Sequence, residues 1–132
     1  MESNKKNINL EYIQNFIKGR EIPLVATQTK LSVQIIFRLC QKMAHDIKFD
    51  EIKVSGHLVI DGHHRYLSAL IMAVELGQLA THATSATQEV GWDTVLFDEE
   101  DWDTPAKIAH LNEMDAKYNN LEVDFVKGIT TR

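Results

Sequence analysis

The spacing of hydrophobic residues predicts three helices in the first part of the chain. Apolar side chains recur every three or four positions over residues 9–18, 31–45 and 64–76, which is the period of an amphipathic helix. Asn9 suits the N-cap of the first helix, and Gly77 suits the residue that ends the third. The middle segment has the clearest apolar stripe and predicts the longest helix.

Shorter β-prone runs predict strands between and after these helices. Pro23 lies inside the first run and favours an edge strand there, while Ser55 and Gly56 predict a tight hairpin turn inside the second. The predicted strand regions are residues 21–26, 51–61, 80–90, 93–97 and 121–126. Thr104 and Pro105 form an N-cap and first-turn pair that opens a further helix, after an acidic loop over residues 98–103.

This mixture of helices and strands predicts an α/β (α+β) fold with a small mixed sheet flanked by three to four helices. With 44% hydrophobic residues in 132, the chain has enough apolar side chains for a single domain over residues 1–132. The one cysteine, Cys40, excludes an internal disulfide and thiolate zinc sites, and it is expected in the core. The absence of a long apolar run predicts no contact with a membrane, and we expect a cytoplasmic protein.

Charge is unevenly distributed along the chain, although the net charge is only −5. Residues 18–65 carry eight Lys and Arg against five Asp and Glu, whereas residues 89–103 carry seven acids and no base. A wholly basic surface for nucleic acid is therefore not expected, but one locally positive face is allowed.

The most informative stretch is IDGHHRY, residues 60–66. A strand, a glycine turn and a helix in succession place the first backbone N–H groups of the helix, after Gly62, where an anion would bind. Arg65 adds a bidentate donor, and His63 and His64 add a hydrogen-bond donor or a proton. The alternative is that Asp61 caps the helix while the basic side chains face solvent or pair with residues 98–103.

A second hypothesis for this region is a metal site, with His57, His63, His64 and Asp61 as ligands. Adjacent histidines on a helix do not readily face one ion, and neither His-x-x-x-His nor Glu-x-x-His spacing is present. A histidine acting as general base stays open.

The segment VSGHLVIDGHHRYLSALIMAVELG resembles the signature of the ParB/sulfiredoxin superfamily, in which a strand-turn-helix carries a G-x-x-R core. It is similar both to the GERR box of chromosome-partitioning proteins and to the GGCHRY box of sulfiredoxins, and the resemblance covers about residues 21–80. His63 stands where sulfiredoxins have the catalytic cysteine, so sulfinic-acid reduction is not expected. No helix-turn-helix pattern follows the box, which weakens the partitioning-protein reading.

The resemblance implies a nucleotide-phosphate pocket formed by the Gly62–Arg65 turn and the helix that begins near Lys30. In such a pocket the positive charge that neutralises the phosphates would come from Arg65, His64 and Lys30. Gly62 and His63 of the turn would also bind phosphate. Candidates for the remaining roles are hydroxyls of Thr29 and Ser32 on phosphate, and the carboxylates of Glu21 and Asp61 as a base or as ligands of Mg²⁺.

Two tryptophans, Trp92 and Trp102, flank the acidic residues of segment 89–103. This segment could dock a protein partner, imitate the charge of nucleic acid, or cover the core while its acids stay solvated. If it folds back towards Arg65, it could supply a carboxylate for Mg²⁺ or an autoinhibitory lid.

We therefore expect a protein that binds a nucleoside di- or triphosphate, with ATP or ADP favoured, and hydrolyses it or transfers its phosphoryl group. A role as a toxin or effector would suit a catalytic domain of this length. One alternative is a nuclease acting on DNA or RNA, with His63 or His64 as general base. Another is a non-catalytic, nucleotide-gated adaptor that controls a protein partner through the acidic segment.

Overall fold

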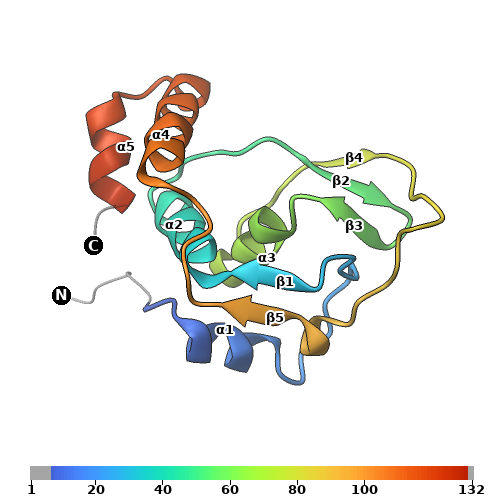
Figure 1. Ribbon diagram of the computed structural model, residues 1–132. Coiled ribbons are helices and arrows are strands. Elements are labelled where there is room, and N and C mark those ends of the chain that lie inside the picture. The colour runs from blue at the N-terminus through green and yellow to red at the C-terminus, as the bar shows by residue number, and fades with distance from the viewer. Residues whose placement is uncertain (1–6, 131–132) are drawn as a thin grey trace.

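The computed structural model describes residues 7–130, and within them the chain forms five α-helices, one 3₁₀ helix and five strands in two small sheets (Figure 1). This confirms the predicted α/β (α+β) class, although the strands of the described residues divide between two sheets rather than one and the α-helices number five rather than three to four. No helix in the described part of the chain is long and apolar enough to cross a membrane.

The first sheet is built around the predicted hairpin. Strand β2 (Ile52–Ser55) pairs antiparallel with β3 (Leu58–Asp61), and Gly56 adopts a φ of 59° at the turn between them. Strand β4 (Gln78–Ala80) pairs parallel with β2 on its other side, which gives the order β3-β2-β4.

The second sheet joins two segments that are far apart in the sequence. Strand β1 (Lys30–Ser32) pairs parallel with β5 (Leu96–Asp98). Because β5 runs directly into residues 98–103, this pairing carries the acidic loop to the start of the helix that follows β1.

Two predicted helices, α2 (Val33–Ala44) and α3 (His63–Met72), pack against each other at the centre of the molecule. Their apolar faces form the main core, and Cys40 lies in it with 1% of its surface exposed, as expected. The residues of these two helices that belong to this core are Val33, Ile36, Phe37, Cys40, Tyr66, Leu67 and Ile71.

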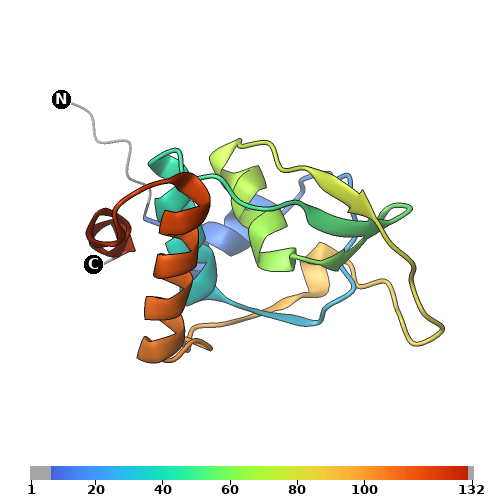
Figure 2. The ribbon, with the colours of Figure 1, turned by 90° about the horizontal axis from the view of Figure 1, so that it is seen from above.

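Three further helices complete the fold. Helix α1 (Leu10–Ile17) is capped by the Asn9 side chain, and α4 (Pro105–Asn119) is capped by Thr104, both as predicted. Helix α5 (Val123–Thr130) packs against α4 and α2. Figures 1 and 2 show α4 and α5 beside α2 at one end of the molecule, with the β2–β3 turn at the other.

Two strand predictions in the first sheet region were too long. Residues 21–26 form only isolated bridges, from Val25 to Leu58 and from Ala26 to Val90, because Pro23 and the surrounding bend interrupt regular pairing. Of residues 80–90 only Ala80 belongs to β4, and the segment continues as an exposed loop. The Thr-rich composition has β propensity, but among the described residues its backbone pairs with other segments only at its two ends, from Thr81 to Val54 and from Val90 to Ala26.

The later predictions need three corrections. Residues 93–97 divide into a 3₁₀ helix, η1 (Trp92–Thr94), and the start of β5. Residues 121–126, predicted as a strand, lead into helix α5, since Val126 and Ile129 are buried together at a helical spacing. Helix α3 ends at Met72 rather than at residue 76, because Ala73 adopts a left-handed conformation that closes it.

Candidate functional site

The turn between β3 and α3 requires glycine at position 62. Gly62 has a φ of 96°, and a Cβ atom there would lie 2.7 Å from Cγ2 of Ile52 and 2.8 Å from an Nη atom of Arg65. Neither the backbone conformation nor the space admits another side chain. The first turn of α3 has no side-chain cap, so Asp61 does not cap the helix.

His63 is a buried link between α3 and the loop that precedes β1. Only 4% of the residue is exposed, and its Nε2 atom accepts a hydrogen bond from the backbone N–H of Thr27 at 2.9 Å. The Thr27 hydroxyl donates to the carbonyl of Val59 at 2.6 Å, which holds this loop against β3. His63 therefore fixes the position of the backbone around the turn.

His64 makes the corresponding link to the start of α2. Its Nε2 atom accepts from the backbone N–H of Ser32 at 2.9 Å, and the Trp102 ring meets it edge-on, with ring centroids 5.5 Å apart. The two neighbouring histidines thus hold the loop before β1 and the last residue of β1 by the same kind of bond.

Both histidines are neutral at pH 7. Burial lowers the pKa of His64 to about 4, with a further contribution from His63 and opposition from Asp103. Burial also lowers the pKa of His63, against the opposing effect of Asp61. A ring whose Nε2 accepts an N–H bond carries its proton on Nδ1, so the lone pair that a general base would use is already engaged in each ring.

Arg65 has a donor without an acceptor. One Nη atom donates to the carbonyl of Glu51 at 3.2 Å, while its Nε is buried and has no hydrogen-bond partner among the described residues. An arginine N–H that is buried without an acceptor is unfavourable, and it marks a place where an oxygen atom of a ligand would be stabilised.

Arg65 borders a small cavity that it shares with two other cations. The cavity has a volume of about 150 Å³, and Arg38 and Lys42 of α2 line it together with Asp103 and Asp115. Lys42 is paired with Asp115, with 2.6 Å between Nζ and Oδ2. Among the described residues Arg65 has no carboxylate partner within salt-bridge distance, in contrast to the two cations of α2.

The acidic loop folds over the start of α2. Arg38 forms a salt bridge to both carboxylate oxygens of Asp101 and a third contact, of 3.1 Å, to Asp103. The Ser32 hydroxyl, on a residue with no exposed surface, donates to the carbonyl of Glu100 at 3.0 Å. The acidic loop is therefore folded back onto α2, and Asp103 lies at the cavity beside Arg65.

The structure does not gather all the residues that the sequence singled out. Lys30 lies on β1 with its Nζ 4.0 Å from Asp98, and Thr29 is exposed just before that strand. Asp61 is exposed at the end of β3, one residue before the turn. Glu21 is exposed on the segment before Val25.

The histidines do not converge with acids on a common point. His57 lies 3.2 Å from Glu89, at the far end of the hairpin from α3. Within residues 7–130 no group of three or more His, Cys, Asp or Glu side chains is arranged to hold a metal ion.

Sequence reasoning missed four residues that shape the site. Thr27 lies between the first predicted strand and the second predicted helix, Arg38 and Lys42 are ordinary polar positions of an amphipathic helix, and Asp115 belongs to α4. Their contacts join residues 32 to 73 positions apart, so no local pattern identifies them. Trp92 is buried and its indole N–H donates to the carbonyl of Leu24, which makes it a core residue.

Comparison of the chain with protein-family models, with curated proteins and with solved structures finds no significant match. The functional argument therefore depends on the geometry of the site.

Proposed function

We propose that this protein binds a nucleoside di- or triphosphate, with its phosphates at the Gly62–Arg65 turn, and hydrolyses it or transfers its phosphoryl group. The observation that carries the proposal is the Arg65 side chain, whose Nε donor is buried without an acceptor at the start of α3. A phosphate oxygen would satisfy this donor, and the partial positive charge of the helix N-terminus would add to the attraction.

The electrostatics of the surrounding residues support a phosphate at this position. The two histidines are neutral, so they would contribute Nδ1–H donors rather than positive charge. Arg65 is the cation beside the cavity that a carboxylate does not already neutralise. Lys30 and Thr29 are exposed on the segment leading into α2 and would contact more distant phosphates, whereas the Ser32 hydroxyl is buried and bonded to Glu100.

A magnesium ion fits this arrangement without a ready-made cage of protein ligands. Mg²⁺ is commonly held by one or two carboxylates together with the phosphates of the nucleotide, where it neutralises the charge that develops during phosphoryl transfer. Asp61, exposed one residue before the turn, and Asp103, which lines the cavity at Arg65, are candidate carboxylates, as is Glu21, exposed on the segment before Val25. Because the Nε2 atoms of His63 and His64 are engaged, we favour a carboxylate over a histidine as base.

A nucleotide-gated adaptor is the second candidate, and the contact between Trp102 and His64 favours it. The acidic loop covers the start of α2 and presents Asp103 to the cavity beside Arg65. Phosphates bound there would repel this carboxylate and favour release of the loop, which would free Trp102, already 41% exposed, from His64 to contact a protein partner.

Thermal unfolding with a ligand panel tests the proposal. The panel contains ATP, ADP, CTP, GTP, NAD and a short DNA, each with and without Mg²⁺. A ligand at about 100 times its dissociation constant adds about 2.7 kcal/mol of stability, so a binding nucleotide should raise the melting temperature by several degrees. Phosphate release measured on the same samples separates an enzyme from an adaptor that binds without turnover.

The control compares two arginines. Arg65→Ala should abolish the nucleotide-dependent shift, whereas Arg20→Ala should retain it, because the Arg20 guanidinium stacks on Phe16 beside α1. Arg65→Lys keeps the charge but not the Nε donor, and it should weaken binding even where the alanine variant unfolds. A shift with DNA alone would favour the nuclease alternative, and an unchanged nucleotide affinity in both Arg65 variants would refute the proposed site.

A further inference from the structure

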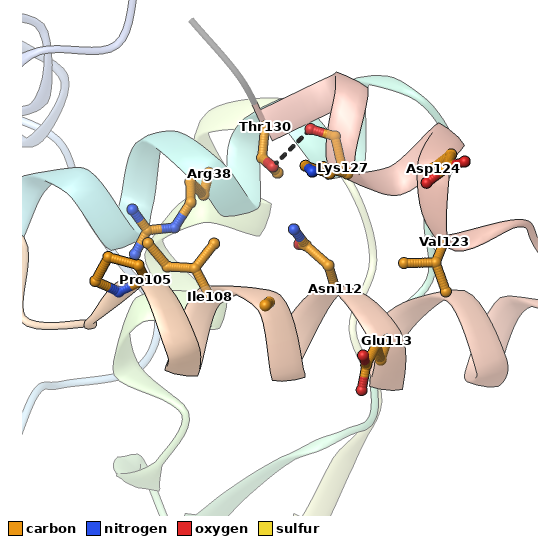
Figure 3. Close-up of a pocket in the computed structure, with 10 residues that line it drawn as sticks. Arg38, Pro105, Ile108, Asn112, Glu113, Val123, Asp124, Lys127 and Thr130 are labelled. Atoms are coloured by element: carbon orange, nitrogen blue, oxygen red, sulfur yellow. Dashed lines mark hydrogen bonds between the residues drawn. The ribbon is translucent and has the colours of Figure 1, made fainter.

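A second, separate cavity lies between α4 and α5, at the end of the molecule next to α2 (Figure 3). Its volume is about 490 Å³, which lies in the range of pockets that hold small organic ligands. Ala116, Val126 and Ile129 bury apolar surface against Ile47 beneath the two helices, so the walls of the cavity are anchored to the rest of the fold.

The walls of this cavity are mainly apolar, and the charges around it nearly balance. Its apolar lining consists of Pro105, Ile108 and Ala109 of α4 and Val123 of α5. The lining also includes two acidic side chains and two basic ones, Glu113, Asp124, Lys127 and Arg38. Arg38 is already neutralised by the acidic loop, so the cavity has no excess positive charge to attract an anion.

The Asn112 side chain extends from α4 into the space between the two helices (Figure 3). Only 4% of this residue is exposed, and its Oδ1 atom is buried without a hydrogen-bond partner among the described residues. Burying an amide oxygen without a donor is unfavourable, and leucine, of similar volume, would occupy the position without that cost.

Asn119 shows how the same residue type is normally accommodated on this helix. Its Oδ1 accepts from the backbone N–H of Lys48 at 2.7 Å, and its Nδ2 donates to the carbonyls of Lys48 and Asp115. The two residues lie two turns apart on one helix. Half-buried Asn119 is fully bonded, whereas buried Asn112 presents its amide to the cavity.

We propose that the cavity between α4 and α5 binds a small uncharged molecule with an apolar body and an N–H donor, and that this donor bonds to Oδ1 of Asn112. The apolar walls set the preference for the body of the ligand, the balanced charges set the preference for a neutral molecule, and Asn112 supplies the directional contact. The site is distinct from the phosphate site proposed at Arg65, although Arg38 lines both cavities.

Titration of the ¹⁵N-labelled full chain with two probes of nearly equal size tests this inference. Benzamide has a phenyl ring and an amide N–H, whereas acetophenone has the same ring and a carbonyl but no donor. Benzamide should shift the amide resonances of Ile108, Asn112 and Val123 and bind about tenfold more tightly than acetophenone, the difference expected of one buried hydrogen bond. Equal binding of the probes, or no shifts at α4 and α5, would overturn the proposal.

Two variants connect the effect with the cavity. Asn112→Leu should remove the preference for benzamide, and Ala109→Phe, which adds a large side chain to the lining of the cavity, should abolish binding of both probes. Asn119→Ser, outside the lining, should leave the preference intact in the folded protein. A preference that survives in Asn112→Leu would overturn the proposal, as would shifts at these residues that depend on protein concentration without any probe, since a second copy would then occupy the cavity.

Discussion

The Nε2 atom of His64 accepts a hydrogen bond from the backbone N–H of Ser32, at 2.9 Å. This bond joins the first turn of α3 to the residue that caps α2, so the N-termini of the two central helices are held in a fixed relation. It also requires His64 to be neutral, with its proton on Nδ1.

The free energy of unfolding should therefore fall as the pH is lowered below neutrality. The folded pKa of His64 is about 4, below the ordinary value of 6.5, so between these values the unfolded state binds a proton that the folded state does not. The stabilisation is fully present above pH 6.5 and is lost as the pH falls towards 4. The full shift corresponds to about 3 kcal/mol, and His63, whose pKa is also lowered, acts in the same direction.

Urea unfolding of the wild type and of His64→Gln at several pH values isolates this effect. Glutamine can accept the Ser32 N–H bond but does not titrate, and the carboxylates contribute equally to both proteins. Between pH 6.5 and 4.5 the variant should lose about 2–3 kcal/mol less stability than the wild type. Parallel curves for the two proteins would show that His64 is not buried as a neutral ring.

Two Gly→Ala substitutions should have opposite effects. At Gly62 the φ of 96° and the contacts below 3 Å with Ile52 and Arg65 should destabilise the protein by about 2–4 kcal/mol. Gly128 lies in helix α5 with no atom near its added Cβ, so alanine there should stabilise the helix by up to about 1 kcal/mol. Thermal unfolding of both variants measures the difference, and a tolerated alanine at position 62 would contradict the geometry of the turn.

The salt bridges of the acidic loop should differ in strength. Arg38 has 12% of its side chain exposed and contacts two aspartates, so Arg38→Met should cost about 1–3 kcal/mol. Lys30 is 55% exposed and lies 4.0 Å from Asp98, so Lys30→Met should change stability by less than about 0.5 kcal/mol. Chemical denaturation compares the two, and fluorescence of Trp102 would report whether the loop detaches in Arg38→Met.

The two asparagines of α4 provide a matched pair for stability. Asn112→Leu removes a buried amide without an oxygen partner and should be neutral or stabilising by about 1 kcal/mol. Asn119→Leu leaves the Lys48 backbone groups without their partners and should destabilise by about 1–3 kcal/mol. Denaturant titrations of both variants decide this, and equal losses would mean that Asn112 is bonded in the folded protein.

Local signals in the sequence were sufficient for several elements. The apolar stripes of α1 and α2, the caps Asn9 and Thr104, and the hairpin turn at Gly56 each depend on residues within a few positions of one another. The IDGHHRY stretch was correctly predicted as strand, glycine turn and helix for the same reason. Such features are determined by backbone preferences and helical periodicity, which a single segment expresses by itself.

Only the tertiary structure decided how these elements are used. The run at residues 121–126 alternates like a strand, but it leads into a helix because Val126 and Ile129 can be buried against Ile47. The sequence predicted His63 and His64 as donors to an anion. In the structure their Nε2 atoms accept hydrogen bonds from the backbone N–H groups of Thr27 and Ser32, more than thirty positions away. The sequence by itself determined the local elements and the turn that Gly62 makes. The burial, hydrogen-bond partners and protonation of the side chains were decided by contacts between distant segments, because these properties depend on what surrounds a group in space rather than along the chain.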